Sequence, residues 1–186
     1  MKALIVVDFT YDFVVGKLPV GDPALAIEER IAELTETFAE RGDWVVMAVD
    51  LHEENDPDHP EAKLFPPHNI RGTAGRELYG RLKDVFAKYA DRITWMDKTR
   101  YSAFHGTALE EELRKRNIRE VHLAGVCTDI CVLHTAVDAY NKGFRTVIHE
   151  DAVASFNAAG HEWALGHFKG TLGAAIARKG SIKEEA

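Results

Sequence analysis

A cysteine at the predicted start of a helix is the residue of this chain best suited to nucleophilic chemistry. Residues 121–133 read Val-His-Leu-Ala-Gly-Val-Cys-Thr-Asp-Ile-Cys-Val-Leu, which predicts a buried strand, a sharp turn and the first turn of a helix. Cys131 falls on that helical turn, among backbone N–H groups at the positive end of the helix dipole. This position favours the thiolate and lowers the pKa of the thiol, so Cys131 is a nucleophile candidate.

An aspartate and a lysine follow two other predicted strands. Asp8 comes directly after residues 3–7, and Lys98 follows residues 93–96. Nucleophilic catalysis by a thiol needs a group that takes the thiol proton and donors for the oxyanion that forms. Asp8 could carry the proton and Lys98 could hold the aspartate in place. Each residue alone has a plainer interpretation as a turn aspartate, a solvated lysine or a buried thiol, but their joint occurrence at strand ends favours a triad.

A second group of residues has the composition of a metal site. Asp50 and His52 alternate along an extended segment, so their side chains point the same way, and His68 and Glu61 follow in the next loop. A mixed nitrogen and oxygen set of this kind suits Zn²⁺, Mn²⁺ or Fe²⁺. Acidic loops with histidines are often merely solvated, and His59 is a competing ligand nearby.

Short apolar runs alternate with helical patterns along the chain. Strands are predicted at residues 3–7, 44–49, 93–96, 121–124 and 146–149, and helical segments at 22–42, 78–86, 108–115, 131–141 and 161–178. Repeated βα units predict a three-layer α/β/α fold with a mainly parallel, Rossmann-like sheet. Ligands bind beyond the carboxyl ends of such strands, where the candidate residues fall. Trp163 and Phe168 are expected in the core.

Composition is that of an ordinary globular chain. The 186 residues are 46% hydrophobic and 28% charged, which predicts a single domain over residues 1–186. The loop at 51–73 is too long for a simple connection and is expected to serve the metal and the substrate. A polar tail is expected at 180–186.

Net charge, the length of apolar runs and cysteine spacing limit the partners and the cellular location that we expect. The formal net charge of −7 disfavours nucleic acid, and no apolar run is long enough to span a membrane. A strand is predicted directly after Met1 and Lys2, without a signal peptide, so we expect a cytoplasmic protein. Cys127 and Cys131 lie too close in sequence for an ordinary disulfide, and we expect both thiols to be free.

Separated motifs in the chain resemble those of a known superfamily. They are VDFTYDF at 7–13, VDLHEEND through PPHNIRGTAG at 49–75, DKTRYSAF at 97–104 and GVCTDICVLHTAVDAYNKGF at 125–144. In this order they resemble the isochorismatase-like cysteine hydrolases, and most closely the nicotinamidase branch. The resemblance extends from Leu4 to about Leu172.

The resemblance implies roles for the candidate catalytic residues. Cys131 would be the nucleophile, Asp8 the general base and Lys98 the third member of the triad. The backbone N–H groups of Cys127 and Cys131 would form the oxyanion hole. The turn of this family would place a cis peptide between Val126 and Cys127, and Cys127 would contribute its N–H group rather than its side chain.

The resemblance also implies ligands for a metal and for a substrate ring. Asp50, His52 and His68 match the divalent metal ligands of nicotinamidases, and Glu61 stands where some members add a fourth; Zn²⁺ is the ion expected first. Phe13, Phe65 and Tyr101 match positions that line the pyridine site, with Leu64 as an alternative to Phe65.

The implied activity is hydrolysis of nicotinamide to nicotinate and ammonia in NAD salvage, with pyrazinamide as an adventitious substrate and a homo-oligomer as the expected assembly. The nearest alternative is a related cysteine hydrolase acting on another amide, a ureido or an N-carbamoyl substrate. Isochorismatase-type vinyl ether hydrolysis needs no thiol, so Cys131 argues against it. A metal- or redox-sensing protein that uses both cysteines is the non-enzymatic alternative.

Overall fold

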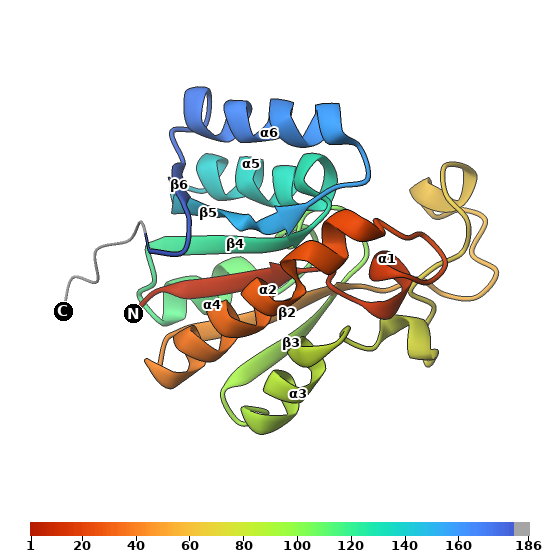
Figure 1. Cartoon of the computed structure of the whole chain (residues 1–186), viewed down its shortest axis with the longest axis horizontal. Helices are drawn as coiled ribbons and strands as arrows, with labels where there is room; N and C mark the ends of the chain where they lie inside the picture. The colour runs from red at the N-terminus through yellow and green to blue at the C-terminus, as the bar shows by residue number, and fades with distance from the viewer. Residues whose placement is uncertain (181–186) are drawn as a thin grey trace.

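A six-stranded sheet forms the centre of the molecule (Figure 1). The computed structural model describes residues 1–180. The strands are β1 (Ala3–Val7), β2 (Trp44–Asp50), β3 (Ile93–Lys98), β4 (Glu120–Val126), β5 (Arg145–Ala154) and β6 (Ala175–Ala177). Their order is β3-β2-β1-β4-β5-β6, and every neighbouring pair is parallel. The predicted α/β class and parallel sheet are confirmed.

The central strands are covered by helices on both faces, and their sequences are apolar at successive positions for this reason. Every residue of β1 and β2 is buried, as expected for central strands of a parallel sheet covered on both sides. Leu4 and Val6 pack into one core, whereas Ala3, Ile5 and Val7 pack into the other. The alternation of side chains along β1 therefore supplies two separate hydrophobic layers.

Helices cover both faces of the sheet (Figure 1). They are α1 (Tyr11–Val14), α2 (Asp22–Glu40), α3 (Arg81–Lys88), α4 (Leu109–Lys115), α5 (Leu133–Asn141) and α6 (Ala158–Gly170), with short 3-10 helices η1 (Pro60–Lys63) and η2 (Ala74–Arg76). Helices α2 and α3 bury their apolar sides in one core, and α4, α5 and α6 bury theirs in the other. The predicted three-layer architecture is therefore confirmed.

The C-terminal region differs from the prediction of one helix over residues 161–178. Helix α6 ends at Gly170, and Gly173 has a positive φ of 63° before the chain enters β6. Residues 175–177 read Ala-Ile-Ala, which gives no clear signal for a strand, yet they pair with residues 147–149 of β5. Pairing with the edge of the sheet, and not the local sequence, therefore determines the strand conformation of residues 175–177. The predicted polar tail lies outside the described residues from position 181 onward.

The expected burial of Trp163 is also wrong. Its side chain is 58% exposed on α6, while Phe168 on the same helix is fully buried as predicted.

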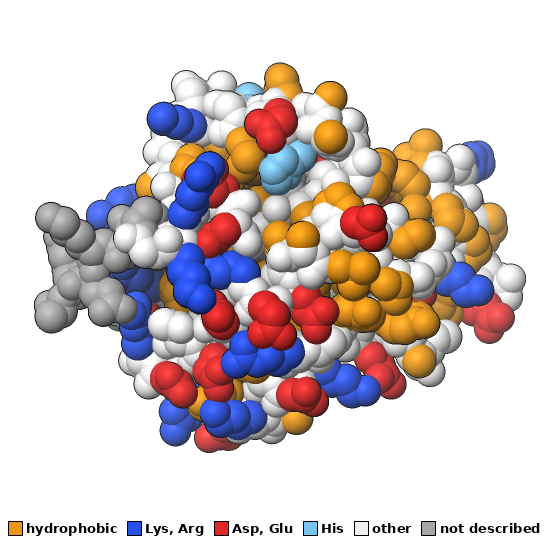
Figure 2. Space-filling view, in the orientation of Figure 1, with side chains coloured by type: hydrophobic (Ala, Val, Ile, Leu, Met, Phe, Trp, Pro, Cys, Tyr) orange, Lys and Arg blue, Asp and Glu red, His pale blue; other side chains and the backbone are white. Residues whose placement is uncertain are grey.

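Figure 2 shows charged side chains of both signs over α2 and α3, and hydrophobic side chains gathered near α1 and the 51–73 loop. Within residues 1–180, no helix is long and apolar enough to cross a membrane.

The chain leaves β1 and β4 toward opposite faces of the sheet. Helix α2, after β1, packs into one core, and α5, after β4, packs into the other. Neighbouring strands whose connections diverge in this way open a crevice at their carboxyl ends. The 51–73 loop lies at this same end, away from both termini (Figure 1).

Candidate active site

The predicted triad converges at the crevice between β1 and β4. Lys98 Nζ lies 2.7 Å from Asp8 Oδ2 and 3.7 Å from Cys131 Sγ. Lys98 Nζ is thus a common neighbour of the Asp8 carboxylate and the Cys131 sulfur. Asp8 and Lys98 are at most 1% exposed and Cys131 is 5% exposed, so bulk water has little access to these contacts.

Close packing of two strand backbones brings Asp8 to the cysteine turn. Gly125, in β4, has a φ of 112°, and a Cβ atom at this position would lie 2.0 Å from the carbonyl oxygen of Val7. Only glycine permits this approach. Asp8 itself has a φ of 55°, and its Oδ1 accepts a hydrogen bond from the N–H of Asp50 at 2.8 Å. The carboxylate is thereby fixed between β1 and β2.

The nucleophile turn has the cis peptide that the resemblance implies, between Val126 and Cys127. It continues as a π-helical turn, η3 (Thr128–Val132), and α5 begins only at Leu133. The N–H groups of Ile130 and Val132 both donate to the carbonyl oxygen of Cys127. Cys131 therefore lies in the first turn of a helix, as predicted, but that turn is π-helical and continues directly into α5.

The expected lowering of the Cys131 pKa is wrong. Burial raises the pKa of this thiol well above its ordinary value, and the nearby charge of Lys98 only partly opposes that effect. Burial likewise raises the pKa of Asp8 from 3.8 to about 6, against the lowering effect of Lys98. At neutral pH the arrangement therefore holds a neutral thiol beside an ionised carboxylate, which is a donor and an acceptor for one proton.

Asp50 joins the triad to the second group of residues, a connection that the sequence did not reveal. Its Oδ1 lies 3.1 Å from Lys98 Nζ, and its Oδ2 lies 3.0 Å from His52 Nε2. Burial opposes the ionisation of Asp50, but Lys98 and His52 outweigh it and lower its pKa well below the usual range. Asp50 pairs with Lys98 in the register of β2 and β3, so a register prediction could have found this contact.

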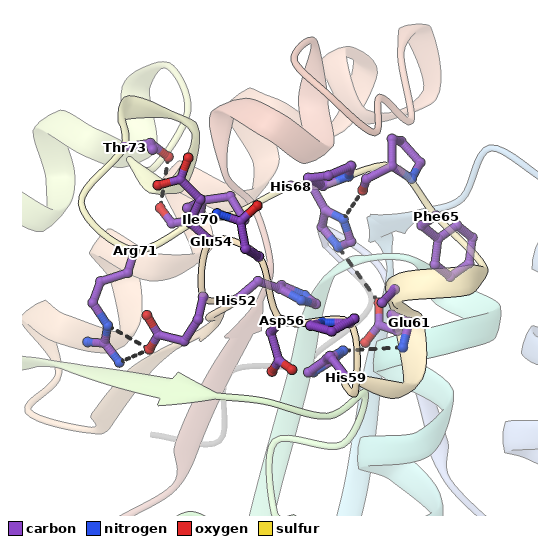
Figure 3. Close-up of a pocket in the computed structure, with 16 residues that line it drawn as sticks. His52, Glu54, Asp56, His59, Glu61, Phe65, His68, Ile70, Arg71 and Thr73 are labelled. Carbon is purple, nitrogen blue, oxygen red and sulfur yellow. Dashed lines mark hydrogen bonds and ion pairs between the residues drawn. The ribbon is translucent and has the colours of Figure 1, made fainter.

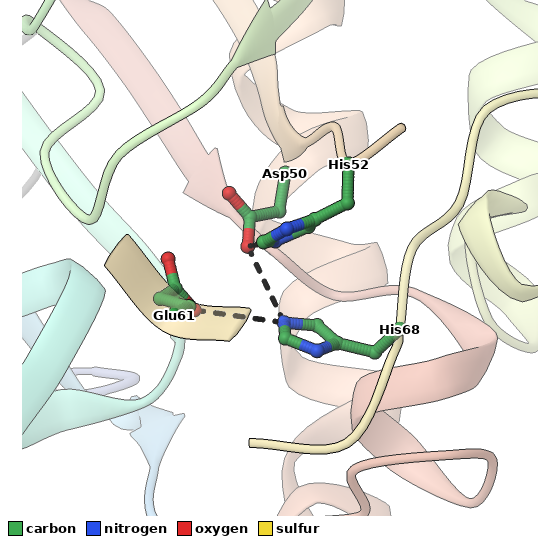
Figure 4. A group of neighbouring side chains, drawn as sticks. All are labelled: Asp50, His52, Glu61 and His68. Atoms are coloured by element: carbon green, nitrogen blue, oxygen red, sulfur yellow. Dashed lines mark hydrogen bonds and ion pairs between the residues drawn. The ribbon is translucent and has the colours of Figure 1, made fainter. Parts of the chain in front are cut away.

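The predicted metal ligands also come together (Figure 4). One ligand atom from each of Asp50, His52, Glu61 and His68 lies within 4.8 Å of all the others, and all four residues are buried. His68 Nε2 is 3.6 Å from Asp50 Oδ2 and 3.7 Å from Glu61 Oε2, distances too long for hydrogen bonds. Glu61 Oε1 has no hydrogen-bond partner either.

These residues fit a divalent cation. Four ligands at about 2.0 Å from a tetrahedral ion lie about 3.3 Å apart, close to the separations seen between His68 and the two carboxylates. His68 Nδ1 lies 2.8 Å from the carbonyl oxygen of Pro66 and donates to it, which leaves the lone pair of Nε2 directed at the carboxylates. A cation would satisfy buried atoms that the protein leaves without partners.

Backbone contacts fix the loop that carries these ligands. The N–H of Asn69, next to His68, donates to Asp12 Oδ2 at 2.8 Å, and the N–H of His52 donates to the carbonyl oxygen of Asn69 at 3.1 Å. Asp12 is buried on the short helix α1. Asn69, the residue after His68, therefore connects the loop to His52 and to Asp12, which lies on the β1 side of the crevice.

His59 has a different position from the ligand set. Its Nδ1 accepts a hydrogen bond from the N–H of Glu61 at 3.2 Å, and its Nε2 lies 2.9 Å from the carbonyl oxygen of Thr99. The ring therefore caps η1 and links it to the segment after β3. Of the two alternatives, Glu61 joins the cluster and His59 supports it.

A narrow cavity of about 20 Å³ leads to Cys131. Phe13, Phe65 and Tyr101 line it as predicted, whereas Leu64 is 65% exposed and does not. The other lining residues are Leu18, Glu61, Cys127, Ile130 and Phe156. Phe156 went unpredicted because the strand predicted at 146–149 ends well before it, whereas β5 extends to Ala154.

A larger cavity of about 630 Å³ lies beneath the 51–73 loop (Figure 3). His52, Glu61 and His68 line it, together with the acidic residues Glu54 and Asp56. Glu61 borders both this cavity and the narrow one beside Cys131. Glu61 therefore lies between the cavity beside Cys131 and a second, acidic opening.

Comparison with known proteins extends over nearly the whole chain. The sequence model of the isochorismatase domain matches residues 2–179. The structure is similar to that of nicotinamidase/pyrazinamidase PncA from Bacillus subtilis, with 61% identity, a TM-score of 0.92 and coverage of 95% of this chain and 100% of that one.

Two more distant structures are also similar. The pyrazinamidase of Pyrococcus horikoshii, solved in complex with zinc, is 32% identical with a TM-score of 0.85, over 95% of this chain and 98% of that one. The N-carbamoylsarcosine amidase from Thermoplasma acidophilum is 32% identical with a TM-score of 0.85, over 98% of this chain and 99% of that one.

Proposed function

Because the chain belongs to the isochorismatase family, we propose that it is a nicotinamidase, which hydrolyses nicotinamide to nicotinate and ammonia through a thioester on Cys131. The observation that carries this proposal is the single buried cluster in which Asp50 contacts both Lys98 of the triad and His52 of the ligand set. The similarity to PncA from Bacillus subtilis supports the same substrate.

The first half of the reaction uses the Asp8 and Cys131 pair. As Sγ attacks the carboxamide carbon, Asp8 takes the thiol proton, with Lys98 Nζ next to both groups. The N–H groups of Cys127 and Cys131 stabilise the oxyanion of the tetrahedral intermediate. The C–N bond then breaks, Asp8 returns the proton to the departing ammonia, and an acyl thioester remains on Cys131.

The second half hydrolyses this thioester. Asp8 accepts a proton from water as the water oxygen attacks the carbonyl carbon, the C–S bond breaks, and the proton passes to the sulfur. Lys98, 2.7 Å from Asp8, holds the carboxylate and favours its ionised form throughout. A buried site of this kind keeps bulk water away from the thioester until ammonia has left.

Asp50, His52, Glu61 and His68 would hold one divalent cation, with Zn²⁺ as the first choice and Mn²⁺ or Fe²⁺ as alternatives. A bound ion would supply a Lewis acid that orients the pyridine ring of the substrate. Phe13, Phe65 and Tyr101 supply the apolar walls for that ring.

The proposal places the enzyme in NAD salvage in the cytoplasm, as a single domain. Both cysteines are free, which agrees with a reducing compartment. Pyrazinamide, an isostere of nicotinamide, is the expected second substrate.

A related cysteine hydrolase that acts on an N-carbamoyl or ureido substrate is the alternative. The similarity to N-carbamoylsarcosine amidase favours it, because that fold match extends over the same part of the chain. The ligand set distinguishes the two, since a substrate without a pyridine nitrogen has no need of a cation at Asp50, His52 and His68.

Ammonia release from nicotinamide, pyrazinamide, N-carbamoylsarcosine and an aliphatic amide tests the proposal, with metal analysis of the same sample. We expect nicotinamide to be preferred, Cys131→Ala to be inactive, and chelation to remove activity that added Zn²⁺, Mn²⁺ or Fe²⁺ restores. Trp163→Ala, on the exposed side of α6, is the matched control. Equal activity of the wild type and Cys131→Ala, or a preference for the N-carbamoyl substrate, would overturn it.

A further inference from the structure

The cavity beside Cys131 is too small for the ring of the proposed substrate. Its volume of about 20 Å³ is room for about one water molecule. A pyridinecarboxamide is several times larger, so a wall of the cavity must move before the carboxamide carbon can reach the sulfur. The identity of that wall determines which rings are admitted.

Burial distinguishes the fixed walls from the movable one. Phe13, Cys127, Cys131 and Glu61 are 5–6% exposed, so the surrounding core holds them in place. Phe156 lines the same cavity but is 49% exposed. A side chain with solvent on one side changes rotamer without displacing its neighbours.

The half-buried aromatic walls have ring partners that Phe156 lacks. Phe65 lies edge-on to His68, with ring centroids 6.4 Å apart, and Tyr101 lies 5.2 Å from His134. Among the ring pairs found in residues 1–180, none includes Phe156. Its ring is therefore an aromatic wall that can turn without breaking a ring–ring contact among the described residues.

The backbone that carries Phe156 is nevertheless fixed to the nucleophile turn. Ser155 Oγ donates to Asp129 Oδ1 at 2.6 Å, and Asn157 Nδ2 donates to Asp129 Oδ2 at 3.4 Å. These contacts leave the side-chain torsions of Phe156 as its main freedom.

We propose that Phe156 is the gate of the catalytic cavity and a specificity-determining residue for its ring substrate. Its ring turns outward to admit the substrate and then closes against the outer edge of the bound ring. The substrate class rests on the proposed nicotinamidase function, whereas the control of access to Cys131 does not.

Alkylation of Cys131 tests the gate without any turnover. The rates of modification by iodoacetamide and by the bulkier N-phenylmaleimide are followed by mass spectrometry of the Cys131 peptide. Removing one aromatic contact accounts for about a twofold to tenfold change, so we expect at least a threefold faster modification in Phe156→Ala, greater for the bulkier reagent. Trp163→Ala, another exposed aromatic, serves as the control.

Steady-state kinetics test the specificity role. With nicotinamide we expect Phe156→Ala to raise KM about threefold to tenfold with a smaller change in kcat, because the outer contact with the ring is lost. The kcat/KM for quinoline-3-carboxamide relative to nicotinamide should rise about tenfold, with Phe156→Leu intermediate.

Each result has a distinct meaning. Alkylation rates of Phe156→Ala equal to those of the wild type overturn the gate, and an unchanged preference between the two amides overturns its role in specificity. If the wild type does not hydrolyse nicotinamide but Phe156→Ala still accelerates alkylation, the proposed function fails and the gate stands. Thermal unfolding of each variant identifies any loss of folding.

Discussion

Asp50 shows how one residue makes two groups of functional side chains depend on each other. One of its oxygens contacts Lys98 and the other contacts His52, while its backbone N–H donates to Asp8. Under the proposed function, a ligand of the cation thus also sets the position and the charge of the catalytic pair. Any substitution of Asp50 is expected to affect metal affinity and thiol chemistry together.

The pH dependence of activity is predicted from Asp8. Burial raises its pKa to about 6, and only the ionised form accepts the thiol proton. We expect kcat/KM to fall about tenfold per pH unit as the pH decreases below about 6. The measurement is kcat/KM for nicotinamide from pH 4.5 to 8, and a flat profile would contradict the assignment of Asp8 as base.

The loss of activity at acidic pH should not come from unfolding through this group. The pKa of Asp8 is higher in the folded protein, about 6, than its ordinary value of 3.8. The folded state therefore binds the proton more tightly, and protonation of Asp8 between these values stabilises the fold. Circular dichroism at each pH is the control.

Removal of Lys98 is expected to destabilise the fold strongly. Lys98→Met leaves the buried carboxylates of Asp8 and Asp50 without their shared cation and should cost about 3–5 kcal/mol in free energy of unfolding. Combining it with Asp50→Asn removes one of the two unpaired charges, so the double variant should lose less than the sum of the single changes. Urea unfolding in chelator measures this; additivity within about 0.5 kcal/mol would contradict it.

At the residue scale, the sequence predicted which side chains meet but not their ionisation states. Asp8, Lys98 and Cys131 could be placed together because each follows a strand. The pKa of Cys131 was predicted in the wrong direction, because the helix dipole is visible in the sequence pattern whereas the depth of burial is not. Phe156 was missed because a lone exposed phenylalanine carries no motif.

Among the elements, the close approach of β4 to β1 depends on one glycine. Gly125→Ala puts a Cβ 2.0 Å from the carbonyl oxygen of Val7 at a φ of 112°. We expect a loss of at least about 2 kcal/mol in free energy of unfolding, together with reduced activity, since the nucleophile turn follows directly. Chemical denaturation and kcat measure the two effects.

A second glycine provides the matched control. Gly166 lies within α6, and a Cβ there would meet no atom within 4 Å. Alanine favours a helix by about 0.5–1 kcal/mol over glycine, so Gly166→Ala should stabilise the protein slightly and leave activity unchanged. If both alanine variants behave alike, the explanation from the contact with Val7 is wrong.

The strands could be predicted from the sequence where burial on both faces of the sheet determines their composition. The five predicted strands all exist because continuous apolar runs between turn residues have few alternatives in a sheet covered on both sides. Strand β6 was missed because Ala175–Ala177 is short and two of its three residues are alanine, the best helix former. Its structure depends on the free edge of β5, which local sequence does not encode.

For the whole molecule, a bound cation should stabilise the fold. A ligand at about a hundredfold excess over its dissociation constant adds about 2.7 kcal/mol if it binds only the folded state. For a chain of this size we expect the melting temperature to rise by about 5–10 °C on addition of Zn²⁺ to chelated enzyme.

His68→Ala should abolish this rise, because it removes a buried ligand, whereas His105→Ala at an exposed position should retain it. Differential scanning calorimetry with and without Zn²⁺ measures both. An equal shift in the two variants would contradict the proposed ligand set. The expected homo-oligomer stays a prediction.

The position of β1 in the sheet also has a consequence for synthesis of the chain. Ala3 pairs with Trp44 on one side of β1 and with Val121 on the other. One edge of β1 therefore has no partner strand until 118 more residues (121 − 3) have been synthesised. At roughly 5–20 residues per second, this edge stays open for about 6–24 s on the ribosome. An apolar strand with an open edge is a template for wrong pairing, so slow translation or truncation before β4 is expected to promote aggregation of the nascent chain.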